Sequence, residues 1–136
     1  MKIYEDLKKL DLKEIYIVGS KARDLFAGTN KANDIDMIYD DRKSLKKVAK
    51  LLGKSSWDVR FTDPYEVVSI ELRFPGHEVV QLWKASLDDY WHGATLRINQ
   101  LAYDLKKRRF IVGDKVPRDI STNHTVQVNH CYDSSS

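Results

Sequence analysis

The sequence has a single cysteine, no long hydrophobic run and little excess charge of either sign. Cys131 cannot form an internal disulfide, and a chain without disulfides fits a reducing compartment, so we expect a cytoplasmic protein. No stretch approaches the roughly 20 apolar residues that a membrane-spanning helix needs. The first ten residues, MKIYEDLKKL, do not resemble an export signal. These absences argue against a disulfide-stapled secreted domain and against a membrane partner.

What remains is the composition of an ordinary globular domain. The 136 residues are 42% hydrophobic and 32% charged, with a net charge of +3, which predicts one folded domain rather than two. The basic residues cluster in two segments, which suits a polyanion as well as a solvated helix face: Lys43, Lys46, Lys47, Lys50 and Lys54, then Lys106, Lys107, Arg108 and Arg109. The four histidines lack metal-ligand spacing, so we expect no zinc site.

Hydrophobic periodicity predicts alternating helices and strands. A Gly or Ser stands at several of the predicted ends, where each residue typically caps a helix. The expected helices are 4–13, 20–28, 40–53, 86–91 and 94–105, and the expected strands are 14–19, 34–39, 56–63, 65–74, 77–83 and 108–113.

Two aspartates flank one isoleucine in the strand predicted over 34–39. Residues i and i+2 of a strand project from the same face, so Asp34 and Asp36 point together while Ile35 points into the core. Their Cα atoms would lie about 6–7 Å apart. Mg²⁺ binds through one or two such carboxylates and completes its shell with waters and substrate phosphates. In an aspartate-rich chain, the pair alone is weak evidence for a metal site. The neighbouring sequence makes the assignment stronger.

That context is a glycine–serine turn upstream of the aspartates. A predicted strand ends at Gly19, and a helix is expected to start at once with Ser20 as a possible N-cap. The free amides and the dipole of a helix N-terminus favour a phosphate. An anion cradle, two carboxylates and a basic surface together predict phosphoryl-transfer chemistry with metal ions.

The segment VGSKARDLFAG followed by DIDM resembles the signature of the DNA polymerase β-type nucleotidyltransferase superfamily. More narrowly, it is similar to the head domain of class II CCA-adding enzymes and bacterial poly(A) polymerases. The segment INQLAYD (98–104) resembles the helix that closes that head domain. The resemblance implies an α+β nucleotidyltransferase fold, with a small mixed or antiparallel sheet and helices packed on one side. We expect residues 1–120 to form this catalytic head and 121–136 a polar tail.

The same resemblance implies roles for five matching residues. Gly19 and Ser20 would hold the triphosphate of a nucleotide, and Arg23 would contact the triphosphate or brace the carboxylates. Asp34 and Asp36 would be the metal ligands and catalytic acids. Two Mg²⁺ ions would be the cofactors, and an NTP would be the substrate.

A third carboxylate is implied on a neighbouring strand, with two candidates. Glu78 matches the family's glutamate in position and is favoured, whereas Glu71 has apolar neighbours on both sides. If Pro75 and Gly76 form a two-residue turn, Glu78 pairs with Arg73, Glu71 pairs with Val80, and both acids share one sheet face.

Two departures from the family bear on function. The usual Arg-Arg-Asp before the closing segment is absent, and only Arg97 is near. The resemblance also stops before the neck, body and tail domains of those enzymes, so we expect that a protein partner could supply them. We expect transfer of a nucleoside monophosphate to an acceptor hydroxyl, best an RNA or tRNA 3′ end, with release of pyrophosphate. The alternatives are a protein or small-molecule acceptor, and a non-catalytic module that binds nucleotide or RNA.

Overall fold

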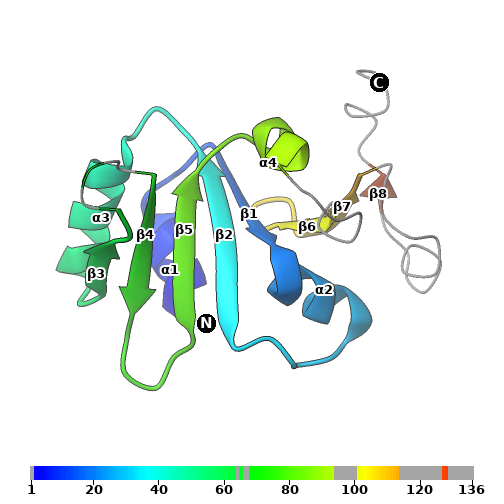
Figure 1. The fold of residues 1–136 in the computed structure, drawn as a ribbon, viewed down its shortest axis with the longest axis horizontal. Coiled ribbons are helices and arrows are strands. Elements are labelled where there is room, and N and C mark those ends of the chain that lie inside the picture. Colours follow the sequence, from blue (N-terminus) through cyan, green and yellow to red (C-terminus); the bar gives the residue numbers. More distant parts are fainter. Residues whose placement is uncertain (1, 64, 66–67, 94–100, 114–126, 129–136) are drawn as a thin grey trace.

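Helices and strands alternate along most of the chain (Figure 1). The computed structural model describes residues 2–63, 65, 68–93, 101–113 and 127–128. None of the helices in these ranges is long and apolar enough to cross a membrane. The elements are, in order, α1 (Lys2–Lys9), β1 (Glu14–Val18), α2 (Gly19–Ala27), β2 (Asp34–Asp40), α3 (Leu45–Lys54), β3 (Asp58–Phe61), β4 (Ser69–Arg73), β5 (Val79–Lys84), α4 (Leu87–Gly93), β6 (Leu101–Asp104), β7 (Arg109–Val112) and β8 (Gln127–Val128).

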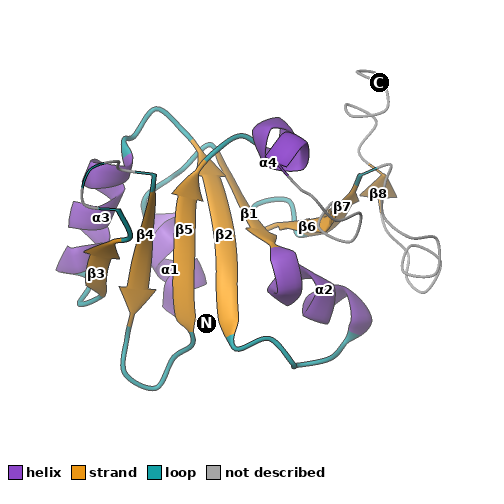
Figure 2. Cartoon of the chain, in the orientation of Figure 1, coloured by secondary structure: helices purple, strands orange, loops and turns teal. Residues whose placement is uncertain are grey.

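All described strands belong to one sheet in the order β3-β4-β5-β2-β1-β6-β7-β8. Neighbouring strands are antiparallel except for β2 with β5 and β7 with β8, which are parallel. Figure 2 shows β5, β2 and β1 at the centre of the sheet. This mixed, mostly antiparallel sheet with its helices confirms the predicted α+β class.

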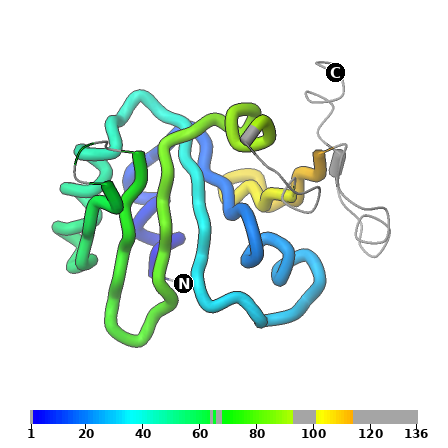
Figure 3. The backbone as a smooth tube through the Cα atoms, in the orientation of Figure 1, coloured from blue at the N-terminus to red at the C-terminus, as the bar shows by residue number. Residues whose placement is uncertain are grey.

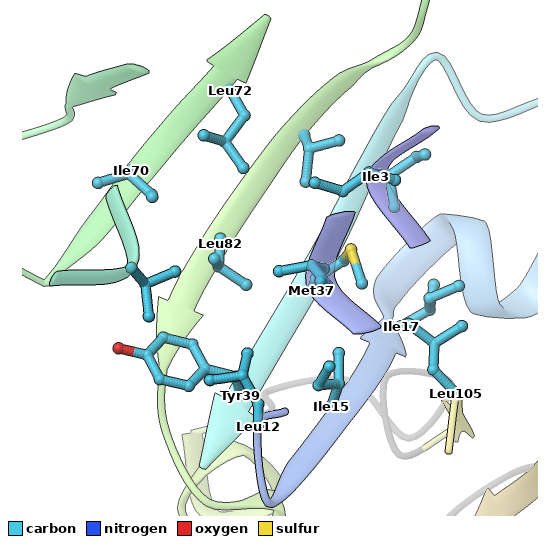
Figure 4. Packing of buried hydrophobic residues seen from close by; sticks show 14 of the residues in the cluster. Ile3, Leu12, Ile15, Ile17, Met37, Tyr39, Ile70, Leu72, Leu82 and Leu105 are labelled. Atoms are coloured by element: carbon cyan, nitrogen blue, oxygen red, sulfur yellow. The ribbon is translucent and has the colours of Figure 1, made fainter. Parts of the chain in front are cut away.

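The main core lies between the sheet and the helices α1, α2 and α3. It contains inward-facing residues of the central strands, such as Ile17, Met37 and Leu82, which are fully buried (Figure 4). Each such side chain stabilises the fold by about 2 kcal/mol relative to an exposed one. The alternating residues of β1 and β2 therefore face the other side of the sheet.

A second, smaller cluster lies on that other side, under α4. Leu87 and Trp91 of α4 pack on Tyr16, Val18 and Ile38 of the central strands. The helix begins as predicted, because the Ser86 hydroxyl accepts a hydrogen bond of 3.0 Å from the Asp89 amide. The α4 helix thus covers part of the face on which alternation places Asp34 and Asp36.

The predicted helix over 94–105 is wrong where the structure describes it. Leu101–Asp104 form β6, which pairs with β1 and with β7; residues 94–100, including Arg97, lie outside the described residues. A four-residue apolar segment has too few turns to distinguish the two periods, and here two non-local strand partners decide the outcome.

The hairpin between β4 and β5 also differs from the prediction. Its connection has five residues, 74–78, and the His77 amide donates to the Phe74 carbonyl at 3.1 Å with Gly76 at φ 78°. Pro-Gly with a positive φ at the glycine is typical of a type II turn. The longer loop shifts the register by one, so Glu71 pairs with Gln81 and Leu72 with Val80. The predicted pairing of Glu71 with Val80 is therefore wrong.

Candidate nucleotide and metal site

The junction of β1 and α2 lies against the second aspartate of β2. The helix begins at Gly19, one residue earlier than predicted, and its N-cap, Val18, makes no side-chain capping bond. Ser20 is consequently in the first turn of α2 rather than at its cap. Gly19 has φ +66°, and a Cβ there would lie 3.0 Å from Asp36 Oδ2. Glycine is required here both for its backbone and for the close approach of the carboxylate. Figure 3 shows the chain running from β1 into α2 and returning to β2.

Asp34 and Asp36 lie on the same face of β2, as predicted from their spacing. Ile35 between them is buried in the main core, whereas Asp34 is exposed and Asp36 is half-buried. Burial, and next the charge of Asp34, raise the pKa of Asp36 above its ordinary value of 3.8. A carboxylate whose charged form is disfavoured by a neighbouring acid is a setting that a divalent cation would stabilise.

A cavity of about 410 Å³ lies beside α2 and brings Ser20 and Arg23 together. Lys31 and Thr29 line the same cavity, so two cationic side chains and two side chains with hydroxyl groups border it. Asp24 also borders it but is used structurally, since its carboxylate accepts hydrogen bonds from Thr29 Oγ1 and the Lys31 amide, both at 2.8 Å. Gly28 ends α2, as predicted, and it adopts the left-handed conformation. The cavity has the charge and size to accept an anionic group.

Tyr90 of α4 reaches this junction, which sequence reasoning missed. Its hydroxyl lies close enough to the Gly19 amide and to the Asp36 carboxylate for both to act on its pKa. Burial, and next the charge of Asp36, raise the pKa of Tyr90 to about 12, although the Gly19 amide opposes this rise. The hydroxyl therefore keeps its proton at neutral pH. From the sequence, a tyrosine in a short helix is expected only to pack against its neighbours. No sequence pattern connects Tyr90 with the turn at Gly19, 71 residues earlier.

Glu78 is held by a lysine of α2. Lys21 is 6% exposed, and its Nζ lies 3.4 Å from Glu78 Oε1 and 3.3 Å from Oε2. Tyr4 of α1 is near as well: burial, and next the charge of Glu78, raise its pKa to about 12. Because α1 and α2 cover the main core, Glu78 lies on the helix-covered side. The predicted Arg73–Glu78 pair is therefore wrong, and Glu78 does not share the face of Glu71.

Glu71 instead belongs to a polar row that crosses the open face. Its carboxylate accepts from Arg73 Nε at 3.1 Å, from Arg73 Nη2 at 3.4 Å and from Gln81 Nε2 at 3.2 Å. The hydrogen bond from Arg73 is the main reason that the pKa of Glu71 lies below its ordinary value. Gln81 is in turn the register partner of Asp36, and Asp36 is the partner of Val18. The polar row thus joins β4, β5 and β2, and it ends at the buried Val18 of β1.

The donor set fits Mg²⁺ in part. Asp34 and Asp36 supply the one or two carboxylates that this ion usually takes from a protein. Within the described ranges, no group of three or more His, Cys, Asp or Glu side chains could hold a metal ion. Among the described residues, no third acid therefore lies close enough to Asp34 and Asp36 to complete a three-acid metal site.

The same fold occurs in solved structures of enzymes that act on tRNA. A tRNA nucleotidyltransferase with a primer tRNA and an ATP analogue matches at 18% identity and a TM-score of 0.66, over 98% of this chain and 41% of its own. A CCA-adding enzyme with CTP matches at 18% identity and 0.60, over 76% and 24%. The Thermotoga maritima CCA-adding enzyme with tRNA matches at 20% identity and 0.60, over 76% and 25%.

These likenesses confirm the predicted resemblance to the nucleotidyltransferase superfamily at the level of the fold. The chain spans less than half the length of each of these enzymes. No protein-family model matches the sequence, and no curated protein matches it either.

Proposed function

We propose that this chain is an Mg²⁺-dependent nucleotidyltransferase head that moves a nucleoside monophosphate from an NTP to an acceptor hydroxyl. The observation that carries the proposal is the contact between Gly19 and the Asp36 carboxylate. That contact puts a candidate metal ligand against a helix N-terminus, which favours phosphate. A nucleotide bound by its phosphates at α2 would then lie within reach of the acids on β2.

Each residue has a defined part in this proposal. Ser20 and Arg23 would bind the β- and γ-phosphates in the cavity beside α2, and the Gly19 backbone would allow their close approach. Asp34 and Asp36 would hold Mg²⁺, which when bound neutralises developing charge on the phosphates. The acceptor oxygen forms a bond to the α-phosphorus, the bond from that phosphorus to pyrophosphate breaks, and the hydroxyl proton leaves to a base.

The identity of the third carboxylate stays a prediction, and the positions of its two candidates favour a structural part for both. Glu78, the favoured candidate, is paired with Lys21 on the helix-covered side, which suits fixing α2 to the start of β5 better than touching an acceptor. Glu71 is on the open face but is held by Arg73. Among the acids of the described residues, we therefore assign the direct contacts with substrate to Asp34 and Asp36.

RNA is the proposed acceptor, with a tRNA 3′ end as its best candidate. Two features support it: the solved relatives contain tRNA, and the α3 helix exposes Lys46, Lys47 and Lys50 on the side away from its buried stripe. Such a basic face attracts a phosphate backbone without selecting its sequence.

Label transfer tests the proposal. The protein would be incubated with each labelled NTP, Mg²⁺ and total RNA, beside Asp36→Ala and the control Asp40→Asn, which removes an acid from the far end of the same strand. We expect label in RNA with the parent and Asp40→Asn, and none with Asp36→Ala. Label in a protein band or a small molecule would change the acceptor. No transfer to any acceptor by the parent would refute the proposal.

A non-catalytic nucleotide-binding module is the second candidate. It is favoured by one observation, that the described residues gather only two acids at the site. The thermal shift produced by an NTP separates the two cases. A site that has lost its metal chemistry would respond to the NTP without Mg²⁺ and without both aspartates, whereas the proposed enzyme would need them.

A further inference from the structure

Gln81 occupies the place beside Asp36 where a third metal-facing acid would be expected. In the parallel pair of β2 and β5, Asp36 is opposite Gln81 and Asp34 is opposite Val79. Neighbouring strands lie about 4.8 Å apart, so Gln81 is one strand from Asp36, whereas Glu71 on β4 is two strands away, about 10 Å. The nearest polar side chain on the adjoining strand is therefore a neutral amide.

The orientation of this amide is fixed by its neighbour. An ionised carboxylate only accepts hydrogen bonds, so the Gln81 NH₂ group must face Glu71, and Nε2 is found 3.2 Å from Glu71 Oε1. Glu71 is itself held by two nitrogens of Arg73, at 3.1 and 3.4 Å, in the fork geometry that fixes a carboxylate well. Because Nε2 is committed to Glu71, the carbonyl oxygen Oε1 faces away from Glu71.

We propose that Gln81 Oε1 is the third protein oxygen of the site, and that Glu71 is a positioning residue that keeps this oxygen directed toward the aspartates. The inference rests on the proposed function and adds one residue to its site. An amide carbonyl is a hard, neutral oxygen of the kind that Mg²⁺ and Ca²⁺ accept from Asn and Gln. The ligand would be a divalent cation, and the acceptor hydroxyl would be its neighbour.

A neutral ligand changes the chemistry in two ways. The site carries two negative charges instead of three, which lowers its affinity for a free cation. An amide oxygen also takes no proton at neutral pH, so Gln81 cannot be the base for the acceptor hydroxyl. The proton of the acceptor hydroxyl must then leave to another base or to water.

Mn²⁺ titration tests the proposal without requiring turnover. The amount of free Mn²⁺ would be followed by its paramagnetic resonance signal, with the metal alone and with a non-hydrolysable ATP analogue. Gln81→Met keeps the side-chain length but removes the oxygen, and we expect it to weaken Mn²⁺ binding by about tenfold or more. Gln81→Glu adds a negative charge, and we expect it to tighten Mn²⁺ binding. Glu71→Gln, which releases the amide, should weaken binding less than Gln81→Met.

Two controls keep the outcomes separate. Asp40→Asn removes a charge from the same strand and should leave Mn²⁺ affinity unchanged, and a melting curve checks that each variant is folded. If Gln81→Met loses stability but binds Mn²⁺ as the parent does, Gln81 only packs and the inference is overturned. If Gln81→Met fails to fold, Gln81→Glu decides, because unchanged affinity there also overturns it.

The same data separate this inference from the proposed function. A parent that binds Mn²⁺ through Asp36 and Gln81 but transfers no label would leave the inference standing while the transferase fails. If the parent transfers label while its Gln81 variants bind Mn²⁺ as the parent does, the proposed function stands and this inference fails. A parent that binds no Mn²⁺ would overturn this inference directly.

Discussion

Replacing Asp36 by asparagine should stabilise the empty protein while removing its response to Mg²⁺. Burial and the neighbouring Asp34 both disfavour the ionised form of Asp36, which is why its pKa is raised. If the Cα spacing of about 6.5 Å is taken as the separation of the charges, with an effective dielectric near 50 for a pair open to solvent on one side, the repulsion is about 1 kcal/mol. The asparagine variant should therefore melt roughly 3–5 °C higher than the parent at neutral pH.

The pH dependence has a definite sign. A carboxyl whose pKa is raised by folding weakens the native state wherever it is ionised, and acidification relieves this penalty. The advantage of Asp36→Asn should be complete at neutral pH and should shrink as the pH falls through the raised pKa toward 3.8. Mg²⁺ at ten times its dissociation constant should stabilise the parent by about 1.4 kcal/mol and Asp36→Asn hardly at all.

Melting curves with and without Mg²⁺, at several pH values, provide the measurement. Asp40→Asn is the control, since it makes the same change on the same strand but away from Asp34. If Asp36→Asn melts below the parent, or if it keeps the full response to Mg²⁺, the reasoning about a strained acid pair is refuted.

Two further predictions concern the acids around the site. Glu78→Gln should lower stability by on the order of 2 kcal/mol, because Lys21 keeps its buried charge without a charged partner, and label transfer by the folded variant in the cold should stay within a few-fold of the parent. A loss of several orders of magnitude at unchanged melting temperature would instead make Glu78 a catalytic acid. Asp24→Asn should lower the melting temperature and remove a pH dependence of the parent. The amides of Ala32 and Lys31 and the Thr29 hydroxyl hold the pKa of Asp24 below 3.8, so its stabilisation is present above that pH and is lost as the pH falls below it; an unchanged acid limb of the stability curve would contradict this.

The local elements around the site could be predicted from the sequence because short-range chemistry determines them. Asp34 and Asp36 flank a buried Ile35 in any strand, and Gly28 ends α2 in the left-handed conformation that glycine accepts. The carboxylate of Asp36 can approach Gly19 only because that position has no Cβ. These features need no knowledge of distant partners.

The parts that failed depend on non-local pairing. Leu101–Asp104 become a strand because β1 and β7 are there to pair with them. The register of β4 with β5 is set by a loop that is longer than predicted and contains a type II turn. This loop shifts the pairing by one residue, so Glu71 lies opposite Gln81 instead of Val80. The roles of Lys21, Gln81 and Tyr90 follow from contacts across elements, which no spacing within one segment reveals.

The Tyr90 hydroxyl lies beside the Gly19 amide, so a ligand that enters at this turn meets a polar group already there. An anion that binds the Gly19 amide competes with that hydroxyl, and its net gain is the difference between two interactions rather than one whole bond. The displaced ring belongs to α4, which packs on the second cluster. Occupancy at the end of β1 is thereby coupled mechanically to a helix more than sixty residues later in the chain.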